Sequence, residues 1–269
     1  MSEQRTLKRD EVAVAPREAK EEGLWDLIKV IIQALAIAFV LRTVLFQPFN
    51  IPTGSLIPTL LIGDYIFASK YAYGYSHYSL PGFVDWFPQA MPGRIFSSEP
   101  KRGDIIVFRP PGNPNEDFIK RLIGLPGDKI QLTHGRLYIN GQLVERDPLP
   151  AFSYPNRYGD SVDVPHYEEV LPGGVKHEII QIEGDNGFYS NTSVYEVPPG
   201  HYFMMGDNRD NSEDSRVNPE KGGQVGYVPA ENLIARAEIV FFSVDGAPAW
   251  EFWRWPWTIR WNRLFHIVR

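Results

Sequence analysis

The chain has 269 residues, of which 43% are hydrophobic and 22% are charged, and its formal net charge is −6. This composition excludes wholesale disorder, and the acidic balance argues against nucleic-acid binding, which needs a basic surface. The absence of cysteine excludes disulfides, a thiol nucleophile and a cysteine-ligated metal. The 23 glycines and 23 prolines follow no fixed period, which favours a turn-rich β protein over a helical bundle.

The N-terminal part of the sequence predicts a polar tail and one membrane anchor. Residues 1–23 are polar and charged, so we expect a flexible cytoplasmic tail. Residues 24–46 are mostly apolar and are long enough for a membrane span, which needs about 20 residues. A buried core helix and a cleaved signal peptide are the alternatives. Basic residues in the tail favour an N-terminus on the cytoplasmic side, with the rest of the chain on the outer face.

After Pro48 the pattern changes to short apolar runs separated by glycine and proline, which predicts strands. The predicted strands are 64–71, 104–109, 117–123, 129–132, 136–139, 142–145, 177–183, 201–205 and 233–244. Asn140-Gly141 favours a type I′ hairpin, because both residues tolerate a positive φ. Residues 145–175 are rich in proline, glycine and tyrosine and predict a long irregular insertion.

The C-terminal segment 250–269 is rich in tryptophan and arginine. Its tryptophans are Trp250, Trp253, Trp255, Trp257 and Trp261. Tryptophan and arginine together suit a membrane interface, where one end of a side chain is apolar and the other is hydrated. Packing of the indoles on the β core explains the pattern equally well, and the sequence leaves both interpretations open.

Two segments hold candidate catalytic side chains. Ser55 follows a glycine and lies between two prolines, on a rigid turn that suits a nucleophile with an oxyanion site. An ordinary turn serine is the alternative. Lys120 shares one face of a predicted strand with Phe118 and Leu122. Burial there would lower its pKa from about 10.4 and make it a usable general base. The alternative places Lys120 on a solvated face.

The polar loop 206–216 follows an apolar strand. Its spacing does not fit a calcium loop, because the third position counted from Asp207 is Arg209. A network of Asp–Arg pairs that braces a site fits the composition better. None of the six histidines forms a His-Glu-x-x-His pair, and we expect neither a metal nor a cofactor.

Together these segments resemble the bacterial type I signal peptidases, the membrane-anchored Ser/Lys proteases of the S26 family. The resemblance lies in 51–59 after the apolar span, then 101–108, 118–129 and 206–216, and covers roughly 47–244. It implies a mostly β fold, in which a single N-terminal transmembrane helix (24–46) precedes an all-β catalytic domain (47–269). It also implies an inserted β subdomain at about 131–199.

The resemblance also implies roles for individual residues. Ser55 matches the nucleophile and Lys120 the general base, while the Ser55 N–H and the Thr53 hydroxyl match the oxyanion donors. Ser212 matches the hydroxyl that orients the lysine amine, and Asp214 and Arg216 match a supporting ion pair. The positions that match the lining of the S1 and S3 pockets are Phe49, Ile51, Pro52 and Ile119. The family often has Met at position 56, Ser at 53 and Tyr at 118, where this chain has Leu, Thr and Phe.

The implied activity is removal of N-terminal signal peptides from exported precursors with Ala-x-Ala-type sites, through an acyl-enzyme. The expected partners are these precursors and the lipid bilayer of the cytoplasmic membrane, with the catalytic domain on its periplasmic or extracytoplasmic face. A Ser-x-x-Lys acyltransferase is excluded, because Pro58 stands where its lysine would be. An inactive, membrane-anchored β scaffold of the same fold is the remaining alternative.

Overall fold

The computed structural model describes residues 23–79, 93–155, 160–245 and 251–269. The chain divides into two compact units, 1–39 and 40–269. The predicted tail lies almost wholly outside the described residues. The predicted division of 47–269 into a catalytic domain and an inserted subdomain remains a prediction.

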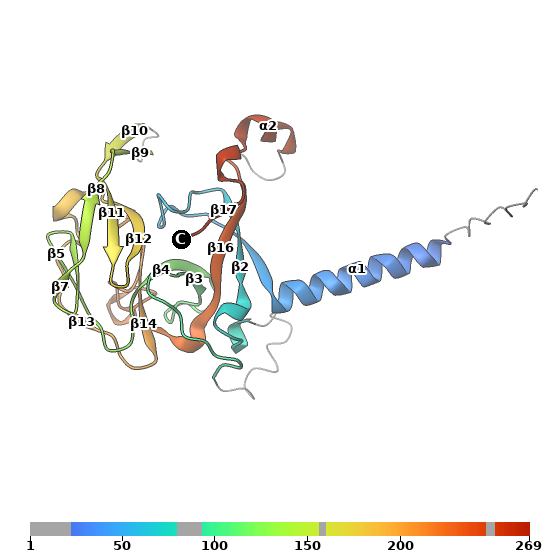
Figure 1. The fold of residues 1–269 in the computed structure, drawn as a ribbon, viewed down its shortest axis with the longest axis horizontal. Coiled ribbons are helices and arrows are strands. Elements are labelled where there is room, and N and C mark those ends of the chain that lie inside the picture. The colour runs from blue at the N-terminus through green and yellow to red at the C-terminus, as the bar shows by residue number, and fades with distance from the viewer. Residues whose placement is uncertain (1–22, 80–92, 156–159, 246–250) are drawn as a thin grey trace, which may run out of the picture. The chain divides into compact units, whose positions relative to one another are not determined.

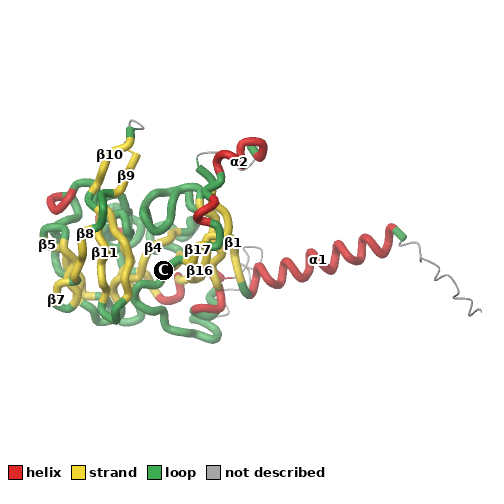
Figure 2. Tube along the Cα trace, turned by 45° about the horizontal axis from the view of Figure 1, so that its top comes forward, coloured by secondary structure: helices red, strands yellow, loops and turns green. Residues whose placement is uncertain are grey.

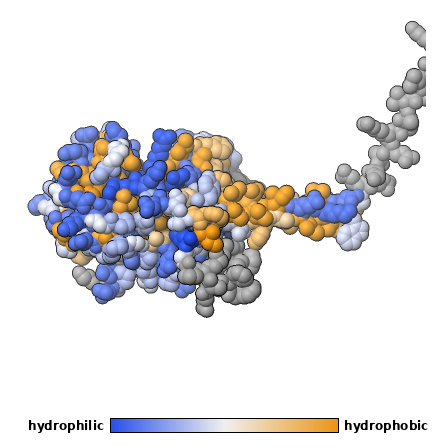
Figure 3. Space-filling model, turned by 60° about the horizontal axis from the view of Figure 1, so that its bottom comes forward, coloured by the Kyte–Doolittle hydropathy of each residue, from blue (hydrophilic) through white to orange (hydrophobic). Residues whose placement is uncertain are grey.

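The apolar N-terminal segment forms the helix α1 (Leu24–Val44), none of whose residues is buried. Figure 3 shows one face of this helix, on which hydrophobic residues are prominent. Among the described residues it is the one helix long and apolar enough to cross a membrane. Asp26 in its first turn and Arg42 in its last turn complement the helix dipole. A core helix would be buried, so the exposed apolar surface is consistent with a membrane anchor.

The largest sheet has eight antiparallel strands (Figure 1). In spatial order they are β1 (Phe46–Asn50), β2 (Asp64–Ser69), β16 (Leu233–Ser243), β3 (Ile105–Phe108), β4 (Phe118–Gly124), β14 (His201–Met205) and β15 (Val228–Pro229), while β17 (His266–Ile267) pairs with β16. All four residues of β3 are buried, as are the last five of β4, so the middle of this sheet is covered on both faces.

Three smaller sheets lie between β4 and β14 in the chain (Figures 1 and 2). The first sheet has the strand order β13 (Tyr195–Glu196), β5 (Lys129–Thr133), β6 (Arg136–Ile139) and β7 (Gln142–Leu143). The second has the order β12 (Val175–Ile180), β11 (His166–Leu171) and β8 (Glu145–Pro148). The third pairs β9 (Phe152–Pro155) with β10 (Ser161–Val164).

The prediction of an irregular insertion at 145–175 is therefore wrong. Its described residues form β8, β9, β10 and β11, which pair in antiparallel register. Two of the glycines that suggested a loop, Gly173 and Gly174, occupy the turn between β11 and β12, where their φ angles are 97° and 80°. The predicted Asn140-Gly141 hairpin is confirmed, with φ of 55° and 77° at the turn between β6 and β7.

Helical structure after α1 is short. The helix α2 (Trp255–Thr258) has four residues. Single 3₁₀ turns occupy Lys70–Ala72, His77–Ser79, Gly184–Asn186, Pro219–Lys221, Ala230–Asn232, Phe252–Arg254 and Trp261–Arg263.

The tryptophans of the C-terminal segment are not buried in the β core where their side chains are described. Trp253, Trp257 and Trp261 are 56%, 84% and 62% exposed. Core packing is therefore wrong for these three, and contact with a membrane interface remains a prediction. Trp250 lies outside the described residues.

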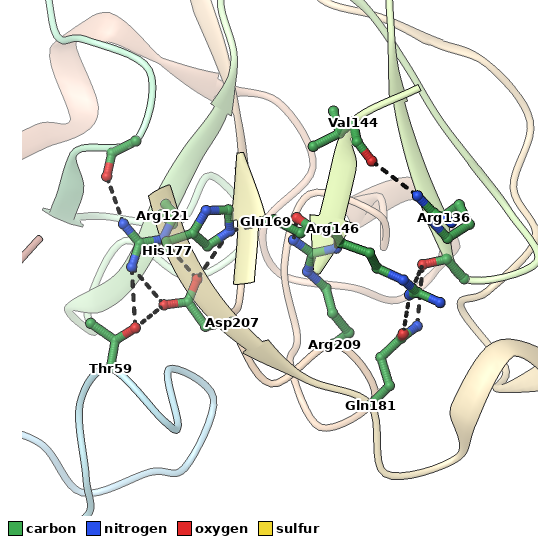
Figure 4. A network of polar contacts seen from close by, with 12 residues as sticks. Thr59, Arg121, Arg136, Val144, Arg146, Glu169, His177, Gln181, Asp207 and Arg209 are labelled. Carbon is green, nitrogen blue, oxygen red and sulfur yellow. Dashed lines mark hydrogen bonds and ion pairs between the residues drawn. The ribbon is translucent and has the colours of Figure 1, made fainter. Parts of the chain in front are cut away.

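A buried network of charges links β4, the polar loop after β14 and the strands β11 and β12 (Figure 4). Arg121 donates to both carboxylate oxygens of Asp207, at 2.8 and 2.7 Å, and to the Thr59 hydroxyl at 3.2 Å. Arg209 forms a bidentate pair with Glu169, and all four charged side chains are buried. The charge on each of these side chains is therefore stabilised by its partner rather than by water, because water does not reach it.

His177 lies between these two ion pairs. Its Nε2 is 3.6 Å from Glu169 and 4.0 Å from Asp207, and neither ring nitrogen forms a hydrogen bond with any described residue. Burial, together with Arg121 and Arg209, lowers the pKa of His177 well below its usual value. The ring is therefore neutral near pH 7 and adds no third positive charge to the network.

We predict that Glu169→Ala is strongly destabilising, because it leaves the Arg209 guanidinium buried without its carboxylate. The expected loss is about 3–5 kcal/mol in the free energy of unfolding, measured by denaturant titration in a non-ionic detergent. The neighbouring Glu168→Ala is the matched control, since Glu168 pairs with an exposed lysine, Lys176. Similar losses in both variants would contradict this account of the network.

Candidate active site

The structure brings Ser55 and Lys120 into contact, although they are 65 residues apart in the chain. Ser55 Oγ and Lys120 Nζ are 2.7 Å apart. Both residues are buried, with 7% and 4% of their surface exposed. The alternative of a solvated Lys120 is therefore wrong. The pairing arises because β4 presents Lys120 beside the segment that joins β1 to β2, which carries Ser55.

Burial changes the protonation of Lys120. It lowers the lysine pKa to about 8, although the carboxylates of Asp214 and Glu213 act in the opposite direction. With that pKa, roughly a tenth of the amine is neutral at pH 7, far more than for an exposed lysine. The Ser55 hydroxyl can donate its proton to the neutral amine, and this contact is the geometry that a serine nucleophile and its base require.

The polar loop after β14 holds the backbone around Ser55. The Asn208 N–H donates to the Ser55 carbonyl at 3.1 Å, and the Asn208 side-chain amide donates to the Gly54 carbonyl at 3.1 Å. A Cβ on Gly206 would lie 2.3 Å from Ser212 Oγ and 2.5 Å from the Ser55 carbonyl oxygen. Only glycine fits at position 206 without displacing one of these groups. The sequence pointed to this loop, but it did not predict that Asn208 binds the backbone carbonyls of Gly54 and Ser55.

Asp214 and Arg216 form the expected ion pair. Arg216 donates to both Asp214 oxygens, at 2.8 and 2.7 Å, and both side chains are buried. Burial raises the pKa of Asp214, but the Arg216 guanidinium, together with hydrogen bonds from the Gly206 N–H and Ser212, outweighs it and holds this pKa below its usual value. Asp214 also accepts from the Gly206 N–H at 3.0 Å, so the charged pair fixes the loop that contacts Ser55.

Ser212 lies in the same loop but does not make the expected contact. Its hydroxyl is buried, and no hydrogen bond joins it to Lys120, although it lies close enough to the Asp214 carboxylate to help lower the pKa of that group. Its orienting role remains a prediction.

A cleft of ≈480 Å³ surrounds the Ser55–Lys120 contact. Its lining includes all four predicted pocket residues, Phe49, Ile51, Pro52 and Ile119, and also Thr53. Among the hydrogen bonds of the described residues, none uses the Ser55 N–H or the Thr53 hydroxyl. Both donors are therefore available to a ligand in the cleft.

One wall of the cleft is an unpaired strand edge. On one side, β3 pairs with β4 from Phe118 to Arg121. On the other side, β14 pairs with β4 only at Arg121, Leu122 and Gly124. Residues 118–120, which line the cleft, therefore have backbone groups that an extended peptide can pair with.

The described residues hold no group of three or more histidine, aspartate or glutamate side chains placed to bind a metal ion.

Comparison with known proteins agrees with the resemblance found in the sequence. The family model for signal peptidase, peptidase S26, matches residues 24–242. The signal peptidase I of Rickettsia conorii is 45% identical over 232 residues, covering 84% of this chain and 81% of that protein. That of Rickettsia typhi is 46% identical over 214 residues, covering 78% of this chain and 76% of that protein.

A crystal structure of a signal peptidase I from Enterococcus faecalis V583 is 27% identical to the chain. The match covers 52% of this chain and 97% of the Enterococcus faecalis chain, with a TM-score of 0.29. The family assignment depends on the sequence matches, which extend over most of the chain. The chain belongs to the signal peptidase family, peptidase S26.

Proposed function

We propose that the protein is a serine endopeptidase that removes N-terminal signal peptides from exported precursor proteins. The observation that carries the proposal is the buried 2.7 Å contact between Ser55 and Lys120 in a cleft with an unpaired strand edge. The relatives that match most of the chain are signal peptidases I. An inactive scaffold would not need a lysine buried against a serine, because burying an amine is costly.

The substrate binds as an added strand along residues 118–120. Side chains before the cut enter the apolar pockets formed by Phe49, Ile51, Pro52 and Ile119, which favour small residues such as those of an Ala-x-Ala site. This arrangement brings the scissile carbonyl to Ser55 at one end of the paired segment.

In the acylation step, neutral Lys120 takes the proton from Ser55 Oγ as the oxygen attacks the carbonyl carbon. The Ser55 N–H and the Thr53 hydroxyl donate hydrogen bonds to the oxyanion. The Lys120 ammonium then gives its proton to the leaving amine, and the C–N bond breaks. In the deacylation step Lys120 takes a proton from water, the water oxygen attacks the ester, and the proton returns to Ser55.

The exposed apolar helix α1 anchors the enzyme in the membrane. The basic residues of the tail support a cytoplasmic N-terminus and a catalytic unit on the outer face. The signal peptide is itself held in the bilayer, so the anchor raises the local concentration of substrate at the cleft.

Ser55→Ala and Lys120→Met are each expected to lower kcat/KM at least about a thousand-fold, because each removes half of the nucleophile–base pair. The assay is cleavage of a precursor with an Ala-x-Ala site by detergent-solubilised protein, with the new N-terminus sequenced. Lys176→Met, at an exposed position, is the matched control and should retain full activity. Cleavage by Ser55→Ala at the rate of the parent would refute the assignment of the nucleophile.

The rate should rise with pH, with a midpoint near the lowered lysine pKa of about 8. Protonated Lys120 cannot accept the serine proton, so activity is lost as pH falls through this value. Burial also lowers the pKa of Lys70 to about 8, so Lys70→Met is the control for the origin of the profile. If the pH profile of kcat/KM lost its midpoint in the Lys70→Met variant, Lys120 would not be the group whose titration controls the rate.

Gly206→Ala is expected to reduce kcat/KM by at least about a hundred-fold, because the added methyl would displace the Ser55 backbone or the Ser212 side chain. Gly23→Ala is the control, since a Cβ there meets nothing within 4 Å. Circular dichroism would show that both variants are folded. A fully active Gly206→Ala enzyme would mean that the contact between this loop and Ser55 is dispensable.

A further inference from the structure

The cleft around Ser55 carries an excess of negative charge. Its lining contains three carboxylates, Glu116, Asp117 and Glu213, whereas Lys120 is the one basic side chain in that lining. Asp117 pairs with Arg109 at 2.7 Å, so its charge is compensated. Neither Glu116 nor Glu213 has an ionic partner within the described parts of the chain. The substrate therefore enters a cleft with two uncompensated carboxylates.

The two uncompensated carboxylates lie at different distances from the reacting atoms. Glu213 is close enough to Lys120 to raise its pKa, and its carboxylate is fixed by the Gln224 N–H at 2.9 Å. Glu116 precedes Lys120 by four residues, just before β4 begins at Phe118. Glu116 lies at a bend, so the four residues that separate it from Lys120 place it at most about 14 Å away.

Strand pairing sets the direction in which a bound substrate runs toward Glu116. A peptide paired with the free edge of β4 advances by one residue for each residue of the strand. Ile119, which lines the proposed pocket for side chains before the cut, lies on the Glu116 side of Lys120. A substrate that continues past the pocket therefore runs toward Glu116 with the residues upstream of the pocket-bound side chains, which are the fourth and fifth before the scissile bond.

We propose that Glu116 is a specificity-determining residue that favours precursors with a basic side chain four or five residues before the cut and disfavours those with an acidic one. Glu213 adds a field of the same sign and lies near Lys120, the one basic side chain of the cleft lining, so it offsets the charge of the Lys120 ammonium. The inference rests on the proposed function, because it assigns a substrate preference to that same cleft.

The test uses three peptide substrates that differ only at the fifth residue before an Ala-x-Ala site, which is Lys, Gln or Glu. At low salt, kcat/KM for the Lys peptide should exceed that for the Glu peptide about five-fold, as expected for partly solvated charges. The ratio should approach one in about 1 M salt, where the screening length falls to about 3 Å.

Three variants separate Glu116 from the general charge of the protein. Glu116→Gln should bring the Lys-to-Glu ratio close to one, and Glu116→Lys should invert it. Glu145→Gln is the matched control, because Glu145 is exposed on β8 and lies outside the cleft lining. This variant should keep the ratio of the parent.

The outcomes distinguish the inference from the function on which it rests. Cleavage of the Gln peptide by the parent establishes proteolysis independently of charge. If the Gln peptide is cleaved and the Lys and Glu peptides are cut equally well by the parent, the inference is overturned and the protease assignment stands. A five-fold ratio that persists in Glu116→Gln overturns the role of Glu116. Failure to cleave any of the three peptides overturns the proposed function itself.

Discussion

Burial of the Lys120 amine against the Ser55 hydroxyl is the constraint on which the rest of the site depends. An ammonium ion in that position would have to be stripped of water, so the fold favours the neutral amine and lowers its pKa to about 8. The strand β3 contributes to this burial, because Ile106 lies opposite Lys120 and is itself fully buried. The same packing that stabilises the sheet therefore sets the protonation of the proposed base.

The loop after β14 fixes the other half of the pair. It binds the backbone of Ser55 through Asn208, and its own shape depends on the Asp214–Arg216 pair. The same loop supplies Asp207 to Arg121, the residue that follows Lys120 on β4. Nucleophile, base and loop are thus linked by buried hydrogen bonds and ion pairs, whose partners cannot be replaced by water. This gives the proposed site a rigid geometry.

The cleft combines this rigid pair with an edge that the sheet leaves open. Exposed strand edges invite pairing with other chains, and proteins usually cover them or keep them short. Here the open stretch is limited to 118–120 and lies beside Ser55, with the carboxylates of Glu116 and Asp117 directly before it. The edge is suited to pairing with an extended precursor. In the proposed role, Glu116 makes that edge favour precursors with a basic side chain before the cut.

Local pattern in the sequence was enough to predict α1, the Asn140-Gly141 hairpin, most strands of the large sheet and the chemical character of three segments. These features depend on residues close together in the chain, such as an apolar run or two turn residues with positive φ. The strands β8 to β11 were missed, because they are short and polar and are defined by partners rather than by their own composition. The burial of Lys120, its contact with Ser55 and the exposure of Trp253, Trp257 and Trp261 were decided only by the tertiary structure. In each case the deciding quantity is access to water, which depends on segments that lie far away along the chain.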